Sequence, residues 1–97
     1  MKRYIKSAVE PLYTLTEWVN NFDGPLNAYI YIVTGRYHSD VAYSGYECRR
    51  VFVTLREVIN NPDKYPDEYV LNVKDWYVVD VDRTEEKDFY MLYLDPN

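Results

Sequence analysis

The chain has 97 residues, 47% hydrophobic and 28% charged, a composition typical of one globular domain (residues 1–97) and not of a disordered or multidomain protein. Its single cysteine, Cys48, excludes an internal disulfide and a multi-cysteine zinc site, so the reducing cytoplasm is the expected compartment. No apolar stretch reaches the length that a bilayer requires, and a net charge of −5 disfavours direct binding to a phosphate backbone, so neither a membrane nor a nucleic acid is the expected partner.

The first predicted helix begins after Thr14, and a small strand at residues 3–6 could precede it. Thr14 and Glu17 form a capping-box pattern, in which the threonine hydroxyl accepts from the third helical amide and the glutamate reaches back to the cap amide. Asn20 and Asn21 follow, and asparagine can adopt the left-handed conformation that closes a helix. A helix of two turns is too short to be stable alone, so we expect it to pack on a sheet.

The next segments alternate between strand and helix patterns. Residues 28–34 are β-branched and aromatic on both faces, as expected of a central strand covered on one side by helices. Residues 49–53 form a second strand that runs directly into a second helix. Thr54 and Glu57 repeat the capping pattern there, and residues 60–61 end that helix. Residues 69–73 are expected to be extended.

A β-hairpin closes the predicted fold. Residues 76–82 alternate in a way that places Val78, Asp80 and Asp82 on one strand face, and residues 89–94 return after a polar connection. The sequence therefore predicts an α+β fold of two layers, with a mostly antiparallel sheet of four or five strands and two short helices.

An internal repeat organises these elements. Residues 14–23 (TLTEWVNNFD) and 54–63 (TLREVINNPD) are identical at six of ten positions, and the same forty-residue offset aligns Tyr29 with Tyr69 and Val33 with Val73. This register predicts an ancestral duplication of an α-β-β unit, with pseudo-repeats at about residues 14–53 and 54–94. Shared helix-capping chemistry could explain part of the match.

Catalytic patterns are weak throughout the chain. His38 is the only histidine, and its sequential neighbours Ser39 and Asp40 cannot converge on it as a triad. A catalytic thiol at Cys48 would need a histidine base brought close by the fold, and the chain has no histidine other than His38. The Asp80-x-Asp82 pair lacks the further oxygen ligands and the glycine turn of a calcium loop. The three glycines are too far apart for a phosphate-binding loop. We therefore expect no enzyme activity, no metal and no cofactor.

The placement of charge suggests a protein-binding surface. Residues 1–56 carry seven basic and five acidic side chains, whereas residues 57–97 carry four basic and eleven acidic ones. We expect the acidic side chains of the final hairpin to form one solvent-facing patch for a basic protein, and the loop tyrosines to add contacts. These candidate partner-binding residues are Asp80, Asp82, Glu85, Glu86, Asp88, Tyr37, Tyr43 and Tyr46. The acidic residues could instead serve only solubility, and Arg49 and Arg50 could bind nucleic acid locally.

In size, acidity and content of twelve tyrosines, the chain resembles the small acidic proteins of bacteriophages and mobile elements, among them the anti-CRISPR and other anti-defence inhibitors. No family motif carries this resemblance, so it assigns no residue. It implies a non-enzymatic inhibitor that blocks a host nuclease at its nucleic-acid channel. The alternative is an assembly module that forms a homodimer through an edge strand, at residues 89–94 or 49–53.

Overall fold

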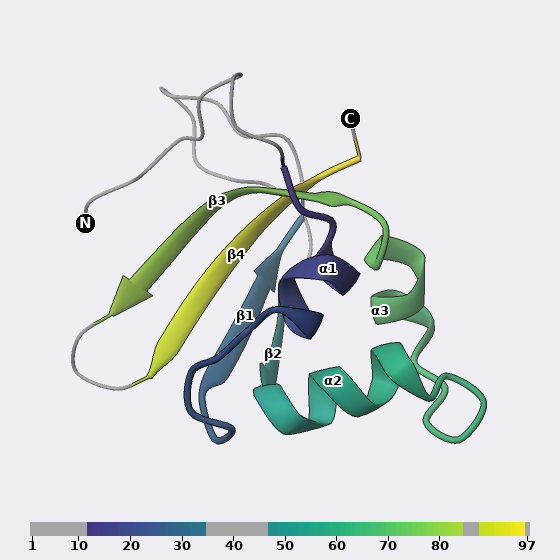
Figure 1. The fold of residues 1–97 in the computed structure, drawn as a ribbon. Coiled ribbons are helices and arrows are strands. Elements are labelled where there is room, and N and C mark those ends of the chain that lie inside the picture. The colour runs from purple at the N-terminus through teal and green to yellow at the C-terminus, as the bar shows by residue number, and fades with distance from the viewer. Residues whose placement is uncertain (1–11, 35–46, 85–87, 97) are drawn as a thin grey trace.

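The computed structural model describes residues 12–34, 47–84 and 88–96, and these residues form three helices and four strands (Figure 1). The elements follow the order α1 (Leu15–Asn20), β1 (Tyr29–Val33), β2 (Glu47–Val51), α2 (Phe52–Asn60), α3 (Glu68–Val73), β3 (Tyr77–Thr84) and β4 (Phe89–Asp95). The α+β class is confirmed. The predicted strand at residues 3–6 lies outside the described ranges, and within those ranges no helix is long and apolar enough to cross a membrane.

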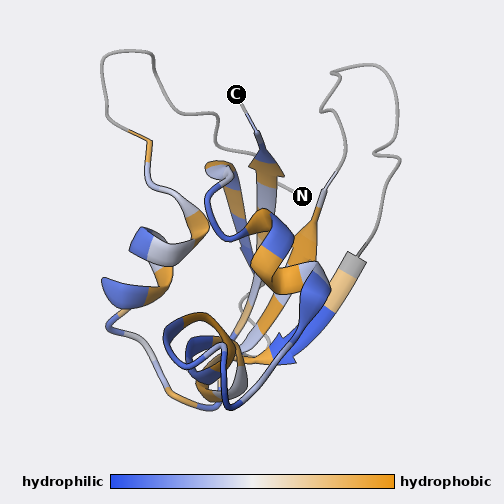
Figure 2. Cartoon of the chain, turned by 90° about the vertical axis from the view of Figure 1, so that its right-hand side faces the viewer, coloured by the Kyte–Doolittle hydropathy of each residue, from blue (hydrophilic) through white to orange (hydrophobic). Residues whose placement is uncertain are grey.

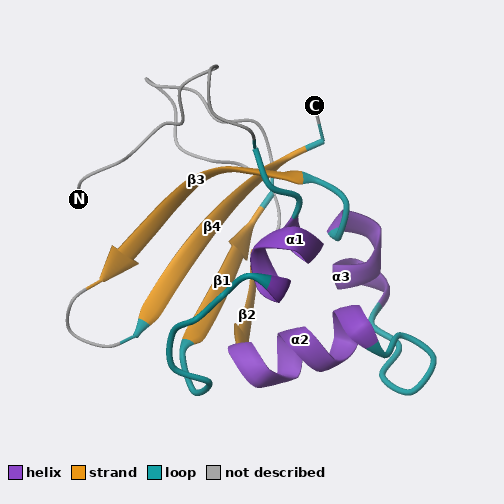
Figure 3. Cartoon of the chain, viewed as in Figure 1, coloured by secondary structure: helices purple, strands orange, loops and turns teal. Residues whose placement is uncertain are grey.

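The four strands form one mixed sheet in the order β2-β1-β4-β3 (Figure 3). The predicted hairpin of β3 and β4 is antiparallel, β1 and β2 also pair antiparallel, and β1 is an interior strand. The central pair differs from the prediction because β4 lies parallel to β1, with Tyr29 opposite Phe89 and Val33 opposite Tyr93. A parallel pair needs a long connection, and here the chain between the two strands forms β2, α2, α3 and β3.

The three described helices pack on one face of the sheet, and none of the described helices lies on the opposite face (Figures 1 and 3). Ile30, Ile32 and Leu92 of the central strands meet Leu15 and Leu55 of the helices, and all five side chains are fully buried. Each helix carries both hydrophilic and hydrophobic residues (Figure 2), as expected when one side of a helix contacts the core and the other contacts water.

Helix α1 begins and ends where the sequence predicts. Thr14 Oγ1 accepts from the Glu17 amide at 3.2 Å, and Glu17 Oε1 accepts from the Thr14 amide at 2.9 Å, so the capping box is confirmed. The helix ends at Asn20, but its C-cap residue, Asn21, has φ −102° and is not left-handed. The Leu15 amide donates to the Trp76 carbonyl at 2.9 Å, and this bond holds the start of α1 beside the start of β3.

The second predicted capping box is wrong. Helix α2 begins at Phe52, two residues before Thr54, and its N-cap Val51 makes no side-chain hydrogen bond. The Phe52 amide donates to the Ala28 carbonyl at 2.7 Å, and the Phe52 side chain is 1% exposed. Burial of Phe52 therefore outweighs the local capping pattern at Thr54 in setting the start of this helix. The preceding strand is Glu47–Val51 instead of 49–53.

Helix α3 occupies a segment that the sequence predicts as extended. Asp67 caps it by accepting from the Val70 amide at 3.2 Å, and the same carboxylate pairs with Arg50 of β2. The forty-residue offset thus aligns Tyr29, in a strand, with Tyr69, in a helix, so that part of the repeat register does not correspond in secondary structure. The helix-strand-strand order still occurs twice, with α3 added to the second half.

A β-bulge at Val79 changes the faces of β3. Val78 pairs with Leu94, but the next pair is Asp80 with Tyr93, so Val79 is an extra residue in the ladder. Simple alternation predicts Val78 and Asp80 on the same face. The bulge instead turns Val78 toward the helices, together with Val81, and turns Asp80 and Asp82 toward the opposite face.

Candidate functional site

The acidic residues of β3 do not project into solvent. Asp80 is 2% exposed and Asp82 is 3% exposed, so the expectation that they belong to a solvent-facing patch is wrong. The Asp80 carboxylate accepts from the Val81 amide at 2.9 Å. Because both carboxylates are buried, reversing their charge is expected to unfold the domain, and not to leave its stability unchanged as the sequence suggests.

The other predicted contact residues do not complete such a patch within the described ranges. Asp88 is half-buried, and its carboxylate accepts from Arg83 Nη2 at 3.2 Å. The remaining predicted contacts lie outside the described residues, namely Glu85, Glu86, Tyr37, Tyr43 and Tyr46, and so does His38.

Exposed carboxylates occur instead in the helical layer. Within the described part of the chain every exposed Asp or Glu lies in a helix or next to one, and these residues are Glu17, Asp23, Asp63, Glu68 and Asp75. Glu17 is engaged in the capping box, and Asp75 accepts from Lys74 Nζ at 3.1 Å. Asp23, Asp63 and Glu68 make no ion pair with another described residue. Among the described residues, the exposed carboxylates thus lie in the helices and in the loops near them.

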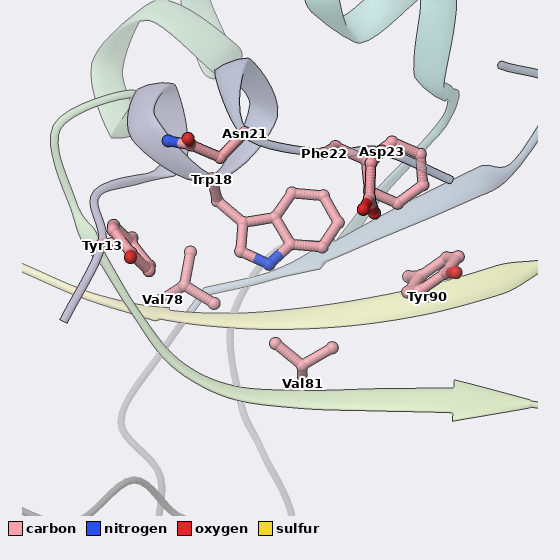
Figure 4. Close-up of a pocket in the computed structure, with 8 residues that line it drawn as sticks. All are labelled: Tyr13, Trp18, Asn21, Phe22, Asp23, Val78, Val81 and Tyr90. Atoms are coloured by element: carbon pink, nitrogen blue, oxygen red, sulfur yellow. The ribbon is translucent and has the colours of Figure 1, made fainter. Parts of the chain in front are cut away.

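A pocket of about 490 Å³ opens between α1 and the strands β3 and β4 (Figure 4). Its lining is mainly aromatic and apolar, with polar groups at the rim: Tyr13, Trp18, Asn21, Phe22, Asp23, Val78, Val81 and Tyr90. This volume lies in the range of about 300–1,000 Å³ typical of ligand sites. We call this feature the aromatic pocket.

Ring packing fixes the walls of the aromatic pocket. The Trp18 and Phe22 ring centroids lie 5.1 Å apart, and Tyr90 stands edge-on to both, at 6.0 Å from Trp18 and 5.3 Å from Phe22. Phe22 also contacts the buried Phe52 ring at 4.4 Å. A Cβ atom at Gly24 would lie 2.5 Å from Phe22 Cζ, so any larger residue at position 24 would displace this ring.

Polar groups stand at the rim of the pocket. Asn21 Nδ2 donates to the Glu17 carbonyl at 2.8 Å, which holds this side chain at the end of α1. Asp23 is exposed, and its carboxylate makes no ion pair with another described residue. On the strand side the Arg83 guanidinium lies 5.4 Å from the Tyr90 ring centroid, and Asp88 balances its charge. Asp23 is therefore the unbalanced charge at the pocket.

Arg49 and Arg50 do not form a common basic patch. Arg49 pairs in register with Tyr31 on the sheet face without helices, where its guanidinium lies 4.6 Å from the Tyr29 ring and 5.2 Å from the Phe89 ring. Arg50 lies on the helix-covered face and pairs with Asp67. The two arginines point to opposite faces, so they cannot contact one phosphate backbone together.

Cys48 is half-buried on β2, as expected of a small strand residue. Burial raises the pKa of its thiol above the ordinary value, and the neighbouring Arg50 guanidinium offsets only part of that rise. The thiol therefore stays protonated at neutral pH, which disfavours a role as nucleophile. No group of three or more metal-ligating side chains occurs among the described residues.

The aromatic pocket was not predicted from the sequence, although one signal for it exists. Trp18 and Phe22 are four residues apart at the end of a predicted helix, a spacing that places two rings side by side. Sequence reasoning treats such rings as core packing, and the other side of the pocket comes from Val78, Val81 and Tyr90, which are distant in the sequence. Comparison of the chain with protein-family models, curated proteins and solved structures finds no match.

Proposed function

We propose that this domain is a non-enzymatic cytoplasmic inhibitor, of phage or mobile-element type, that binds a basic nucleic-acid-binding protein such as a nuclease of a host defence system. The observation that carries the proposal is the position of the exposed carboxylates, all of which, among the described residues, lie in or beside the helices. An anionic surface of this kind competes with phosphates for a groove rich in lysine and arginine.

The contact surface that we propose differs from the residues that the sequence suggests. Asp80 and Asp82 support the fold because they are buried, so they are unsuitable as contacts. Asp63 lies in the connection between α2 and α3, and Glu68 opens α3. Both side chains are exposed and make no ion pair with another described residue, so both are available to a partner.

The test combines charge reversal with a nuclease assay. The immobilised domain is incubated with bacterial lysate, the retained proteins are identified, and the purified nuclease is assayed for DNA cleavage with increasing amounts of the domain. We expect the Asp63→Lys/Glu68→Lys variant to bind about tenfold more weakly, since each exposed ion pair contributes roughly 0.5–1 kcal/mol. The charge-conserving variant Asp63→Glu/Glu68→Asp is the control and should inhibit normally.

The dependence on salt provides a second criterion. Affinity for the nuclease should fall as salt rises, because exposed charges are screened over about 8–10 Å at physiological ionic strength. A nuclease that binds the reversed variant as tightly as the original domain, or a complex that is insensitive to salt, would contradict the proposal.

One observation favours a second function, a homodimer formed through β2. The strand β2 lies at an edge of the described sheet, whereas the other predicted dimer edge, residues 89–94, is wrong because β4 is flanked by β1 and β3. An edge strand presents backbone groups to a second chain. Sedimentation velocity at increasing concentration tests this function, which predicts a dimer that is lost when Arg49→Pro removes a backbone donor from β2.

A further inference from the structure

We infer that the aromatic pocket is a receptor for an arginine side chain of a protein partner, with Asp23 as its counter-ion. This inference rests on the proposed function, since it names the group by which a basic partner would be recognised. The partner's arginine would lie against the aromatic lining of the pocket, with its guanidinium at the carboxylate.

The aromatic lining suits a cation. A guanidinium is attracted to the negative face of an aromatic ring, most strongly where water is partly excluded. The pocket already shows this chemistry within the chain, because the Arg83 guanidinium lies 5.4 Å from the Tyr90 ring centroid. Trp18, whose indole is the best ring for such contacts, is half-buried and lines the same pocket, edge-on to Tyr90.

The carboxylate of Asp23 selects the charge of the ligand. It stands at the rim, turned toward the strand side of the pocket in Figure 4. Arg83, which lies over the Tyr90 ring, is already paired with Asp88 at 3.2 Å, and Asp23 makes no ion pair with another described residue, so its carboxylate is available to a ligand. Arginine fits better than lysine because its planar fork can donate two parallel hydrogen bonds to one carboxylate while its face stacks on a ring.

Other ligand classes fit less well. An anion would meet the repulsion of Asp23, and a purely apolar side chain would desolvate that carboxylate without giving it a partner. The volume of about 490 Å³ also accommodates backbone next to the arginine. The indole nitrogen of Trp18 points toward β3 (Figure 4) and donates no hydrogen bond to another described residue, so it can donate to a carbonyl of the bound segment.

The test needs no identified partner. The ¹⁵N-labelled domain is titrated with N-acetyl-arginine N-methylamide and, separately, with the citrulline analogue, whose neutral urea replaces the guanidinium. Trp18 and Trp76 are the two tryptophans of the chain, so their indole N–H signals report on the pocket and on a site outside its lining. We expect the arginine compound to shift the Trp18 signal in a saturable way, with the citrulline compound about threefold weaker or more.

Asp23→Asn is the informative variant, because residue 23 is exposed and its neutral isostere should leave the fold intact. We expect about three- to fivefold weaker binding of the arginine compound. Asp75→Asn makes the same change of net charge at an exposed site outside the pocket lining and is the matched control, with binding unchanged.

Three results would overturn the inference: equal binding of the two compounds, equal losses in Asp23→Asn and Asp75→Asn, or no shift of the Trp18 signal up to about 50 mM compound. The outcome is separable from that of the proposed function. Binding of the arginine compound without any salt-sensitive nuclease partner refutes the function alone. A nuclease complex that tolerates Asp23→Asn, together with no binding of the compound, refutes the pocket assignment alone.

Discussion

Replacement of Asp67 tests whether one carboxylate joins the sheet to the third helix. Its Oδ1 accepts from the Val70 amide at 3.2 Å and caps α3, and its Oδ2 pairs with Arg50 of β2. Loss of a side-chain cap costs about 1 kcal/mol of unfolding free energy. The ion pair adds about 1 kcal/mol, since its side chains are 30% and 17% exposed and water screens them only in part. Asp67→Ala should therefore lower the free energy of unfolding by about 2 kcal/mol.

Urea unfolding followed by circular dichroism measures this loss. Asp67→Asn keeps a capping oxygen but removes the charge, so it should cost only about 1 kcal/mol. For a domain of this size the Asp67→Ala variant should melt about 10 °C lower. A double-mutant cycle with Arg50→Met isolates the ion pair. The reasoning is refuted if Asn and Ala at residue 67 are equally destabilising, or if the coupling with Arg50 is zero.

Further predictions concern the corrected helix start, the buried residues and the thiol. Thr14→Ala removes the cap of α1 and should lower the free energy of unfolding by about 1 kcal/mol, measured with urea. Thr54 is exposed inside α2, so Thr54→Ala should change this free energy by less than about 0.5 kcal/mol. Equal effects of the two variants would contradict the assigned start of α2. Asp80→Lys should destabilise the domain by about 3 kcal/mol or more, because the residue is 2% exposed, and a melting temperature like that of the original domain would show that this site is accessible to water. Leu55→Ala should cost about 2–5 kcal/mol by the same assay. Burial raises the folded-state pKa of the Cys48 thiol, so the protonated thiol contributes fully to the free energy of unfolding at neutral pH. This contribution is lost as the pH rises above the ordinary thiol pKa of about 8.5. The loss of stability at alkaline pH should therefore be smaller in Cys48→Ala.

Local patterns predicted the elements whose stability is decided locally. The capping box at Thr14 and Glu17 located α1, and alternating apolar residues located the hairpin of β3 and β4. The start of α2 was predicted wrongly because the burial of Phe52 outweighs a favourable pattern at Thr54.

Longer-range features had no comparable local signal. The parallel pairing of β1 with β4 depends on how the whole domain packs, and the bulge at Val79 is one extra residue that alternation cannot reveal. The bulge changes the face of Val78, whereas Asp80 and Asp82 lie opposite Val81 as alternation predicts, and alternation alone cannot reveal that they are buried there. Helix α3 did have a signal, because Asp67 precedes it as an N-cap, but the β-branched and aromatic residues that follow favoured an extended segment.

The central position of β4 has a consequence for synthesis in the cell. Strand β1 can pair with β2 early, but its other edge has no partner until Phe89–Asp95 has left the ribosome. Contacts so distant in sequence are slow to form, and an unpaired strand edge is a site of aggregation in the meantime. We therefore expect ribosome-bound chains stalled before Phe89 to be sensitive to protease, and released chains to become resistant in one cooperative step.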